Sequence, residues 1–225
     1  MSNILVVAPH PDDETLGLGG TIIKNIEKGN CVYWLVVTGM TELAGYSKQQ
    51  INQRDRDIEK IADYYKFEKV FQLRFPAAQL NYGVLGNLIK QVGQVVKEIE
   101  PEEIFLPYPK DIHSDHFFVF EAMKATSKWF RYPYVKRILC YETLSETNFC
   151  LSAVSGSTFI PNVYEDITPY FKGKLEAMNI YASEISSHPF PRSEDSLVAQ
   201  AKLRGSECGC RFAEAFMLLK EIRCE

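Results

Sequence analysis

The sequence has few features of a nucleic-acid-binding or membrane-spanning protein. Its formal net charge is −4, and it has no block of lysine and arginine, so it offers no general attraction for polyanions. Its longest apolar runs, residues 4–9 and 32–37, are far too short to cross a bilayer. The N-terminus lacks a basic segment followed by a signal-type apolar stretch. We therefore expect a cytoplasmic protein with no nucleic-acid partner and no integral membrane segment, and homo-oligomer formation stays open.

The cysteines do not form a recognisable metal or redox motif. All six are scattered along a chain that is large enough to need no disulfide staples. The pair Cys208-Gly209-Cys210 has a one-residue spacer, which is neither CxxC nor a zinc-ribbon spacing. We expect free thiols, and we interpret this pair as incidental.

What the chain does have is the composition of a packed domain, with 46% hydrophobic and 24% charged residues. Short apolar strands are predicted at residues 3–8, 32–37, 69–73 and 103–107, and amphipathic helices at 13–28, 49–65 and 84–99. This βα alternation predicts an α/β fold whose mostly parallel sheet carries helices on both faces. A further strand is expected at 135–141, then helices at 169–184 and 195–205. We expect a single domain over residues 1–225.

Three of the four histidines lie in two short segments, each directly after a predicted strand. These segments are His10-Pro11-Asp12-Asp13-Glu14 and His113-Ser114-Asp115-His116. Ligands bind beyond the carboxyl ends of parallel strands, so both segments belong at the same edge of the sheet. Any one of these residues is ordinary as a helix cap or turn residue, but capping needs only one of them.

Imidazole and carboxylate groups together suit a zinc ion, and a catalytic zinc takes three protein ligands while leaving one position for water. His10, Asp13 and His116 would supply that set. Asp12 would be the general base, and His113 would stabilise the oxyanion with Asp115 near enough to orient or charge it. Glu14 is expected to support the start of the helix.

The sequence does not contain the motifs of a nucleotide-binding loop or of a serine hydrolase. Gly17-Leu18-Gly19-Gly20 does not match Gly-x-Gly-x-x-Gly, because Ile22 stands where the last glycine would be, and no Lys-Ser/Thr pair follows. We expect these glycines to let the first helix pack closely against the sheet. No Gly-x-Ser-x-Gly elbow is present, which argues against a serine hydrolase.

The two histidine segments, about a hundred residues apart, resemble those of the LmbE-like or PIG-L deacetylase family. Segments near the C-terminus, Arg204-Gly205-Ser206-Glu207 and Ala213-Glu214-Ala215-Phe216, also look like parts of this family. The resemblance implies a Rossmann-like fold and one zinc ion per chain. It also implies His10, Asp13 and His116 as ligands, Asp12 as base, and His113 with Asp115 as the oxyanion group.

The family has an Arg-x-x-Glu pattern in its second helix, which we match to Arg56-Asp57-Ile58-Glu59. Arg56 is therefore a candidate substrate contact, and a solvated helix charge is an equal alternative. Asp111 receives no role. His188 lies in a turn-rich segment that reads as a surface loop, although a loop with His and Arg can also close over a sugar.

The resemblance implies a zinc-dependent N-deacetylase that releases acetate and a free amine from an N-acetylated amino sugar or its conjugate. One alternative is the same metal chemistry on a non-sugar amide or another N-acyl group. A metal phosphoesterase would favour more carboxylate ligands and basic groups for phosphate. A non-catalytic sugar-binding module should have lost the base or a ligand, and all of these residues are present.

Overall fold

A computed structural model describes residues 1–151 and 158–223 of the chain. Its centre is one seven-stranded sheet with the strand order β3-β2-β1-β4-β5-β7-β6. The strands are β1 (Asn3–Ala8), β2 (Cys31–Gly39), β3 (Lys69–Pro76), β4 (Glu103–Pro107), β5 (Arg137–Tyr141), β6 (Val163–Asp166) and β7 (Ala213–Glu221). Strands β1 to β5 are parallel to one another, whereas β7 runs antiparallel to β5 and to β6. The predicted mostly parallel, Rossmann-like sheet is confirmed.

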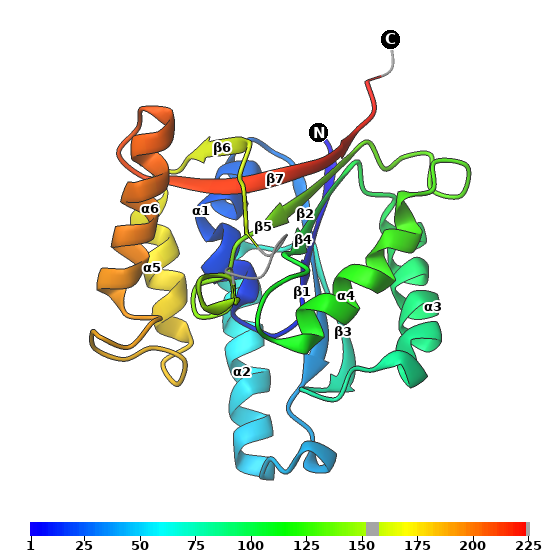
Figure 1. The fold of residues 1–225 in the computed structure, drawn as a ribbon. Helices are drawn as coiled ribbons and strands as arrows, with labels where there is room; N and C mark the ends of the chain where they lie inside the picture. The colour runs from blue at the N-terminus through cyan, green and yellow to red at the C-terminus, as the bar shows by residue number, and fades with distance from the viewer. Residues whose placement is uncertain (152–157, 224–225) are drawn as a thin grey trace.

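Helices cover both faces of this sheet, as the sequence predicts (Figure 1). One face carries α1 (Asp13–Glu27), α2 (Lys48–Tyr65), α5 (Phe171–Ile180) and α6 (Glu194–Cys208), and the other carries α3 (Tyr82–Ile99) and α4 (Ser114–Lys124). Short 3-10 helices lie at η1 (Glu42–Ala44), η2 (Ala125–Ser127) and η3 (Thr147–Phe149).

Two hydrophobic cores lie on either side of the sheet because successive strand residues point to opposite faces. In β1, Ile4 and Val6 pack into the core under α1, α2 and α5. Leu5 and Val7 pack into the core under α3 and α4. Strands buried on both faces read as continuous apolar runs, which is why β1 and β2 were visible in the sequence.

Helix α1 packs tightly against the sheet at Gly17, as predicted, whereas Gly19 and Gly20 lie against other helices and loops. A Cβ atom on Gly17 would lie 2.3 Å from the ring of Tyr141 on β5, so any side chain here would force a shift. The helix also kinks at Leu18, whose φ of −148° is not helical. The kink frees backbone groups from the helical hydrogen-bond ladder.

A buried ion pair binds the groups that the kink frees. The Glu214 carboxylate accepts hydrogen bonds from the N–H groups of Gly20 (3.0 Å) and Thr21 (2.7 Å). The Lys174 ammonium donates to the Leu16 carbonyl (2.9 Å) and to Glu214 (2.7 Å). The C-terminal strand thus supplies a cap for the second half of α1.

Several elements differ from the prediction. Helix α4 and the strands β6 and β7 were not predicted, and the helix expected at 169–184 covers only Phe171–Ile180. Part of the weakly patterned stretch at 151–162 falls on residues 152–157, outside the described residues. Within residues 1–151 and 158–223, no helix is both long and apolar enough to span a membrane.

Candidate metal centre and active site

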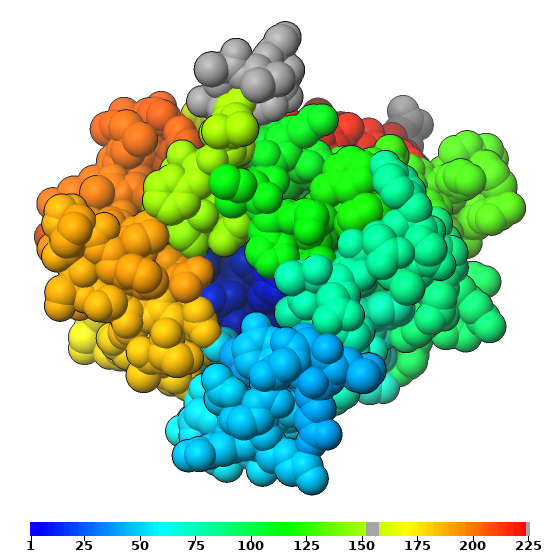
Figure 2. Space-filling view, turned by 60° about the horizontal axis from the view of Figure 1, so that its bottom comes forward, coloured from blue at the N-terminus to red at the C-terminus, as the bar shows by residue number. Residues whose placement is uncertain are grey.

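The two histidine segments meet at one pocket beyond the carboxyl ends of β1 and β4. The residues from His10 to Asp13 form its floor, and loops from five other parts of the chain surround it (Figure 2). The volume of the pocket is about 210 Å³, which is below the roughly 300–1,000 Å³ typical of pockets for drug-sized ligands. The pocket therefore encloses a small group, and a larger ligand would extend through its mouth.

The three predicted metal ligands converge as expected. One ligand atom from each of His10, Asp13 and His116 lies within 4.8 Å of the others. Asp13 Oδ2 is 3.2 Å from His10 Nδ1 and 3.4 Å from His116 Nε2. Strand β1 and helix α1 place the first two, and the first turn of α4 places the third.

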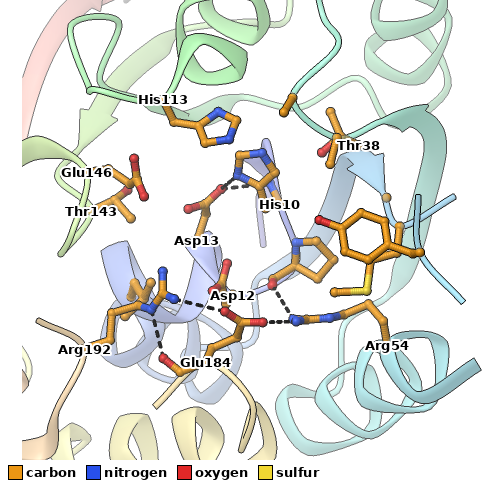
Figure 3. Close-up of a pocket in the computed structure, with 17 residues that line it drawn as sticks. His10, Asp12, Asp13, Thr38, Arg54, His113, Thr143, Glu146, Glu184 and Arg192 are labelled. Carbon is orange, nitrogen blue, oxygen red and sulfur yellow. Dashed lines mark hydrogen bonds and ion pairs between the residues drawn. The ribbon is translucent and has the colours of Figure 1, made fainter. Parts of the chain in front are cut away.

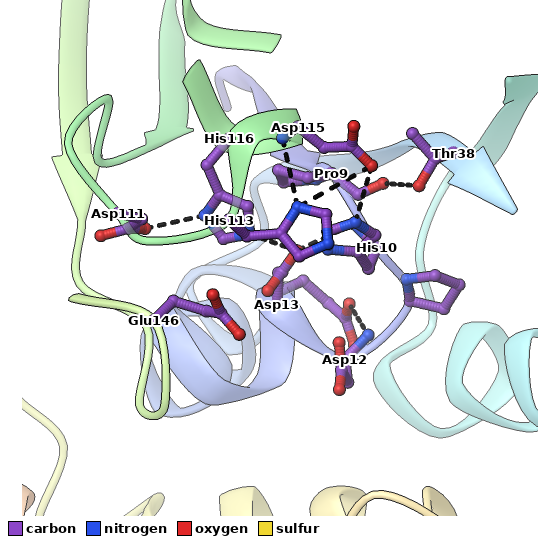
Figure 4. Close-up of polar contacts among 12 residues, drawn as sticks. Pro9, His10, Asp12, Asp13, Thr38, Asp111, His113, Asp115, His116 and Glu146 are labelled. Atoms are coloured by element: carbon purple, nitrogen blue, oxygen red, sulfur yellow. Dashed lines mark hydrogen bonds and ion pairs between the residues drawn. The ribbon is translucent and has the colours of Figure 1, made fainter. Parts of the chain in front are cut away.

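In both His10 and His116, the ring nitrogen that points away from Asp13 contacts another carboxylate (Figure 4). His10 Nε2 lies 3.1 Å from Asp115 Oδ2, and His116 Nδ1 lies 2.7 Å from Asp111 Oδ2. Asp111 in turn accepts a hydrogen bond from the Thr147 hydroxyl at 2.6 Å. Such carboxylate partners fix the ring orientation and the tautomer of histidines that ligate metals.

The unpartnered ring atom of His116 shows that this cluster fits a metal ion. His116 is fully buried, yet its Nε2 forms no hydrogen bond within the described residues. A buried polar atom without a partner is rare and costs free energy. The atom faces Asp13 and His10, where two nitrogen donors and one carboxylate oxygen form a suitable set for a divalent metal with open positions.

The charges around the cluster also suit a cation. Burial would raise the pKa of Asp13, but His116 and His10 outweigh it and lower that pKa. Burial would lower the pKa of His10, but its hydrogen bonds to Asp115 and Asp13 raise that pKa to about 9. The carboxylates of this cluster thus favour positive charge at the site.

Asp12 lies at the pocket wall in an unusual backbone conformation. Its φ of 131° is in the region that side-chain-bearing residues rarely adopt, and its side chain makes no capping hydrogen bond to α1. Asp12 therefore does not cap α1 with its side chain. Instead, the buried Glu14 carboxylate accepts the Asp12 N–H at 3.0 Å and the Tyr181 hydroxyl at 2.9 Å. Glu14 holds the strained turn that points Asp12 toward the pocket.

The pKa of Asp12 is raised well above its usual value, first by burial and then by the negative charges of Asp13 and Glu184. Arg192 and Arg54 oppose this rise. A carboxylate with a raised pKa is a stronger proton acceptor, as a general base must be.

His113 caps helix α4 and lines the pocket. Its Nδ1 accepts a hydrogen bond from the Asp115 N–H at 3.2 Å, so in the neutral ring the proton is on Nε2. Burial, and then the nearby His10, lowers the pKa of His113 to about 4. His113 is therefore a neutral hydrogen-bond donor at neutral pH.

The support from Asp115 differs from the expectation. Its carboxylate is 3.9 Å from His113 Nδ1 but 3.1 Å from His10 Nε2, and it also accepts the Ala78 N–H at 2.7 Å. Asp115 thus orients His10 with its carboxylate and His113 with its backbone N–H.

A second arginine of α2, not the predicted one, reaches the pocket (Figure 3). Arg56 is exposed and donates to Gln53, and it does not line the pocket. Arg54 is buried, donates to the Pro11 carbonyl at 3.0 Å and pairs with Glu184. Two residues correspond to about 200° around a helix, so Arg54 and Arg56 point in nearly opposite directions.

The predicted loop around His188 contributes Arg192 to the pocket, while His188 itself is exposed and does not line it. Arg192 pairs with Glu184 at 3.0 Å. Both pocket arginines are thus tied to the same carboxylate.

The Glu146 carboxylate lines the pocket and, like that of Asp12, has no strong hydrogen-bond partner among the described residues. It is half-buried, and its nearest hydrogen-bond partner is the Ser145 hydroxyl at 3.5 Å. Its carboxylate faces His10 and Asp13 across the pocket (Figures 3 and 4). Sequence reasoning missed Glu146, Arg54, Arg192 and Asp111; for Asp111, the position five residues before His116 was the available signal.

Comparisons with known proteins identify the family of this chain. A family model described as PIG-L: GlcNAc-PI de-N-acetylase matches residues 5–127, which contain both histidine segments. Diacetylchitobiose deacetylase of Thermococcus kodakarensis is 26% identical over 234 residues, covering 99% of this chain and 85% of the relative.

Two solved structures share the fold over nearly the whole chain. The conserved protein TT1542 from Thermus thermophilus has a TM-score of 0.79 at 21% identity, covering 100% of this chain and 98% of its own. N,N'-diacetylchitobiose deacetylase from Pyrococcus horikoshii has a TM-score of 0.77 at 24% identity. The match covers 97% of this chain and 84% of the deacetylase chain. At these identities the two structures establish the fold alone.

Proposed function

Because this chain belongs to the PIG-L family of GlcNAc-PI de-N-acetylases, we propose that it is a zinc-dependent N-deacetylase acting on an N-acetylated amino sugar or its conjugate. The observation that carries the proposal is the convergence of His10, Asp13 and His116, with an unpartnered buried nitrogen, next to the protonatable Asp12. The products would be acetate and a free amine.

His10, Asp13 and His116 would hold one zinc ion per chain. When bound, the ion supplies Lewis-acid polarisation of the amide carbonyl and lowers the pKa of the attacking water. Asp115 and Asp111 keep the two imidazoles oriented toward the ion. The preorganised carboxylates reduce the rearrangement that binding requires.

Asp12 would accept the proton of the attacking water and then deliver it to the departing amine. Its raised pKa makes it a stronger acceptor of that proton. His113 would donate its Nε2–H to the oxygen that becomes negatively charged as the carbonyl carbon turns tetrahedral. A neutral donor stabilises that charge without losing its own proton.

The pocket supports a substrate whose acetylated sugar ring is enclosed while the rest extends outside. Its volume of about 210 Å³ leaves no space for a large aglycone. Glu146 is available to accept hydrogen bonds from sugar hydroxyls, since no other strong partner in the described residues occupies it. Arg54 and Arg192 would shape the pocket wall through Glu184.

A phosphoesterase would need free positive charge for its substrate. Arg54 and Arg192 both pair with Glu184, so their charge is partly neutralised. The same machinery acting on a non-sugar N-acyl group would use identical catalytic residues, and only substrate screening separates the two.

The test is a screen of N-acetylated mono- and disaccharides, sugar nucleotides, glycolipids, non-sugar N-acetyl amines and an aryl phosphate. Acetate and phosphate release are measured with zinc, with a chelator, and with an Asp12→Asn control. Zinc-dependent acetate release from a sugar amide is the expected result. Phosphate release alone, or acetate release that survives both the chelator and the substitution, would overturn the proposal.

A further inference from the structure

Two cysteines flank the turn that leads from α6 into β7. The Sγ atoms of Cys208 and Cys210 lie 3.5 Å apart. Cys208 is exposed and Cys210 is half-buried, and neither lines the catalytic pocket. The one-residue spacing, which matches no common motif, is thus compatible with direct contact of the two thiols.

The backbone of this turn brings the two side chains together. Gly209 has a φ of 81°, a left-handed conformation that glycine adopts at little cost. The N–H groups of Gly209 and Cys210 both donate to the Gly205 carbonyl, at 2.8 and 3.0 Å. A Cβ atom on Gly205 would be only 2.6 Å from the Cys210 carbonyl oxygen, so the helix end and the turn are tightly packed.

Little movement separates this arrangement from a covalent bond. A disulfide bond is about 2.0 Å long, so the sulfur atoms need to approach by about 1.5 Å from their separation of 3.5 Å. The two sulfur atoms are therefore already close to bonding distance.

The two thiols are not equivalent. Burial, and then the hydrogen bond with Cys208, raises the pKa of Cys210 to about 11. Cys210 Sγ also donates to the Phe212 carbonyl at 3.3 Å. The thiolate is the reactive form of cysteine, so the exposed Cys208 is the sulfur that an external reagent meets, and Cys210 follows.

We propose that Cys208 and Cys210 form a redox-active dithiol that low-molecular-weight disulfides oxidise to an intramolecular disulfide. The Cys208 thiolate attacks one sulfur of the external disulfide, which breaks that bond and releases one small thiol. Cys210 then loses its proton and attacks Cys208 Sγ in the mixed disulfide, releasing the second small thiol. The protein loses two electrons and two protons, and the two released thiols carry them away.

The experiment incubates the whole protein with oxidised glutathione and follows its mass and its cysteine peptides. The expected product has lost two hydrogens, carries no glutathione, and yields one peptide that contains the 208–210 bond. A reducing agent restores both thiols. Cys31→Ser is the matched control, because this half-buried cysteine lies on β2 away from the pair; its product should be unchanged.

Single variants separate the two steps. In Cys210→Ser, a glutathione adduct should accumulate on Cys208 because the second attack is lost. In Cys208→Ser, reaction at Cys210 should be slower by about tenfold or more, since Cys210 is half-buried and its Sγ donates to the Phe212 carbonyl. Lasting glutathione adducts on the unmodified chain, or a disulfide that joins either residue to another cysteine, would overturn the proposal. Deacetylation should continue in both variants, so this outcome is independent of the proposed catalytic function.

Discussion

At the scale of single residues, the carboxylates behind the histidines decide how well the site can hold an ion. Asp111 fixes His116 through a 2.7 Å hydrogen bond and is itself fixed by Thr147. We predict that Asp111→Asn weakens zinc affinity by about 10–100-fold, because the ring loses its orienting charge. His10→Ala and His116→Ala should lose the ion altogether. Competition with a chromophoric chelator measures all three.

The matched control for these variants is His188→Ala, since His188 is exposed and outside the pocket. It should keep one zinc per chain. Full metal content in both His10→Ala and His116→Ala would contradict the assignment of ligands.

Asp12 and His113 should affect turnover while leaving the ion in place. We predict that Asp12→Asn lowers kcat by about 10²–10⁴-fold because the proton acceptor is lost. His113→Ala should lower kcat by about 10²–10³-fold with little change in KM, because its donor acts on the developing charge. Steady-state kinetics with metal analysis of the same samples checks both. Near-normal kcat in Asp12→Asn would remove this residue from catalysis.

Glu146 should affect binding of the sugar and not the chemical step. Replacing it with Gln removes a charged acceptor, and hydrogen bonds to charged groups contribute about 1.5–3 kcal/mol. We predict a rise in KM of about tenfold or more with kcat nearly unchanged. Glu59→Gln, an exposed substitution on α2, is the control. A fall in kcat at constant KM would instead place Glu146 in the chemistry.

The residues that could be predicted from sequence are those whose chemistry is concentrated in short segments. His10, Asp13 and His116 follow buried strands, where polar side chains have no structural reason to gather. Arg54 was not predicted because the rotation of α2 about its own axis decides whether Arg54 or Arg56 faces the pocket. The sequence alone does not fix that rotation. Glu146 was not predicted as a site residue because it follows β5 in an irregular segment without hydrophobic periodicity.

At the scale of elements, the kink in α1 depends on the buried pair of Lys174 and Glu214. Lys174→Met would leave the Glu214 carboxylate buried without its cation, which typically costs about 3–5 kcal/mol. We predict a loss of that size in the free energy of unfolding, measured by urea denaturation. The double variant Lys174→Met/Glu214→Gln should be less destabilised than the sum of its single variants. Strict additivity would show that the two groups do not depend on each other.

The elements that were predicted from the sequence have a strong local hydrophobic pattern. Strands β1, β2 and β4 are covered on both faces and read as apolar runs, and α2 and α3 show helical periodicity. Helix α4 was missed because its first turn is polar and two of its residues, Asp115 and His116, are buried at the site, which hides the amphipathic pattern. The edge strand β6 has only four residues, Val163–Asp166, too few to display alternation.

At the scale of the whole molecule, an ion that binds only the folded chain must also stabilise it. Zinc at about 100 times its dissociation constant contributes roughly 2.7 kcal/mol. For a chain of this length, each kcal/mol raises Tm by about 2–4 °C. We predict that a chelator lowers Tm by roughly 5–10 °C, measured by calorimetry. His116→Ala should show no such chelator effect, and an equal shift in that variant would contradict a site made by these ligands.

The mostly parallel sheet was predictable as a whole because its first four strands alternate with helices. Its antiparallel end was not, because β7 pairs with β5 across about 75 intervening residues and local patterns carry no information on such pairing. The expectation of one domain over residues 1–225 stays a prediction.

The hydrogen bond between Gly20 and Glu214 joins residues separated by 194 positions. During translation, the ribosome releases His10, Asp13 and His116 long before Glu214 is made. Until then, the freed N–H groups of Gly20 and Thr21 have no acceptor, and the helix that positions Asp13 is unfinished. A nascent or prematurely terminated chain would hold every metal ligand without the support for a rigid site. Formation of the kinked helix beside Asp13 thus depends on a glutamate that is synthesised much later than the helix itself.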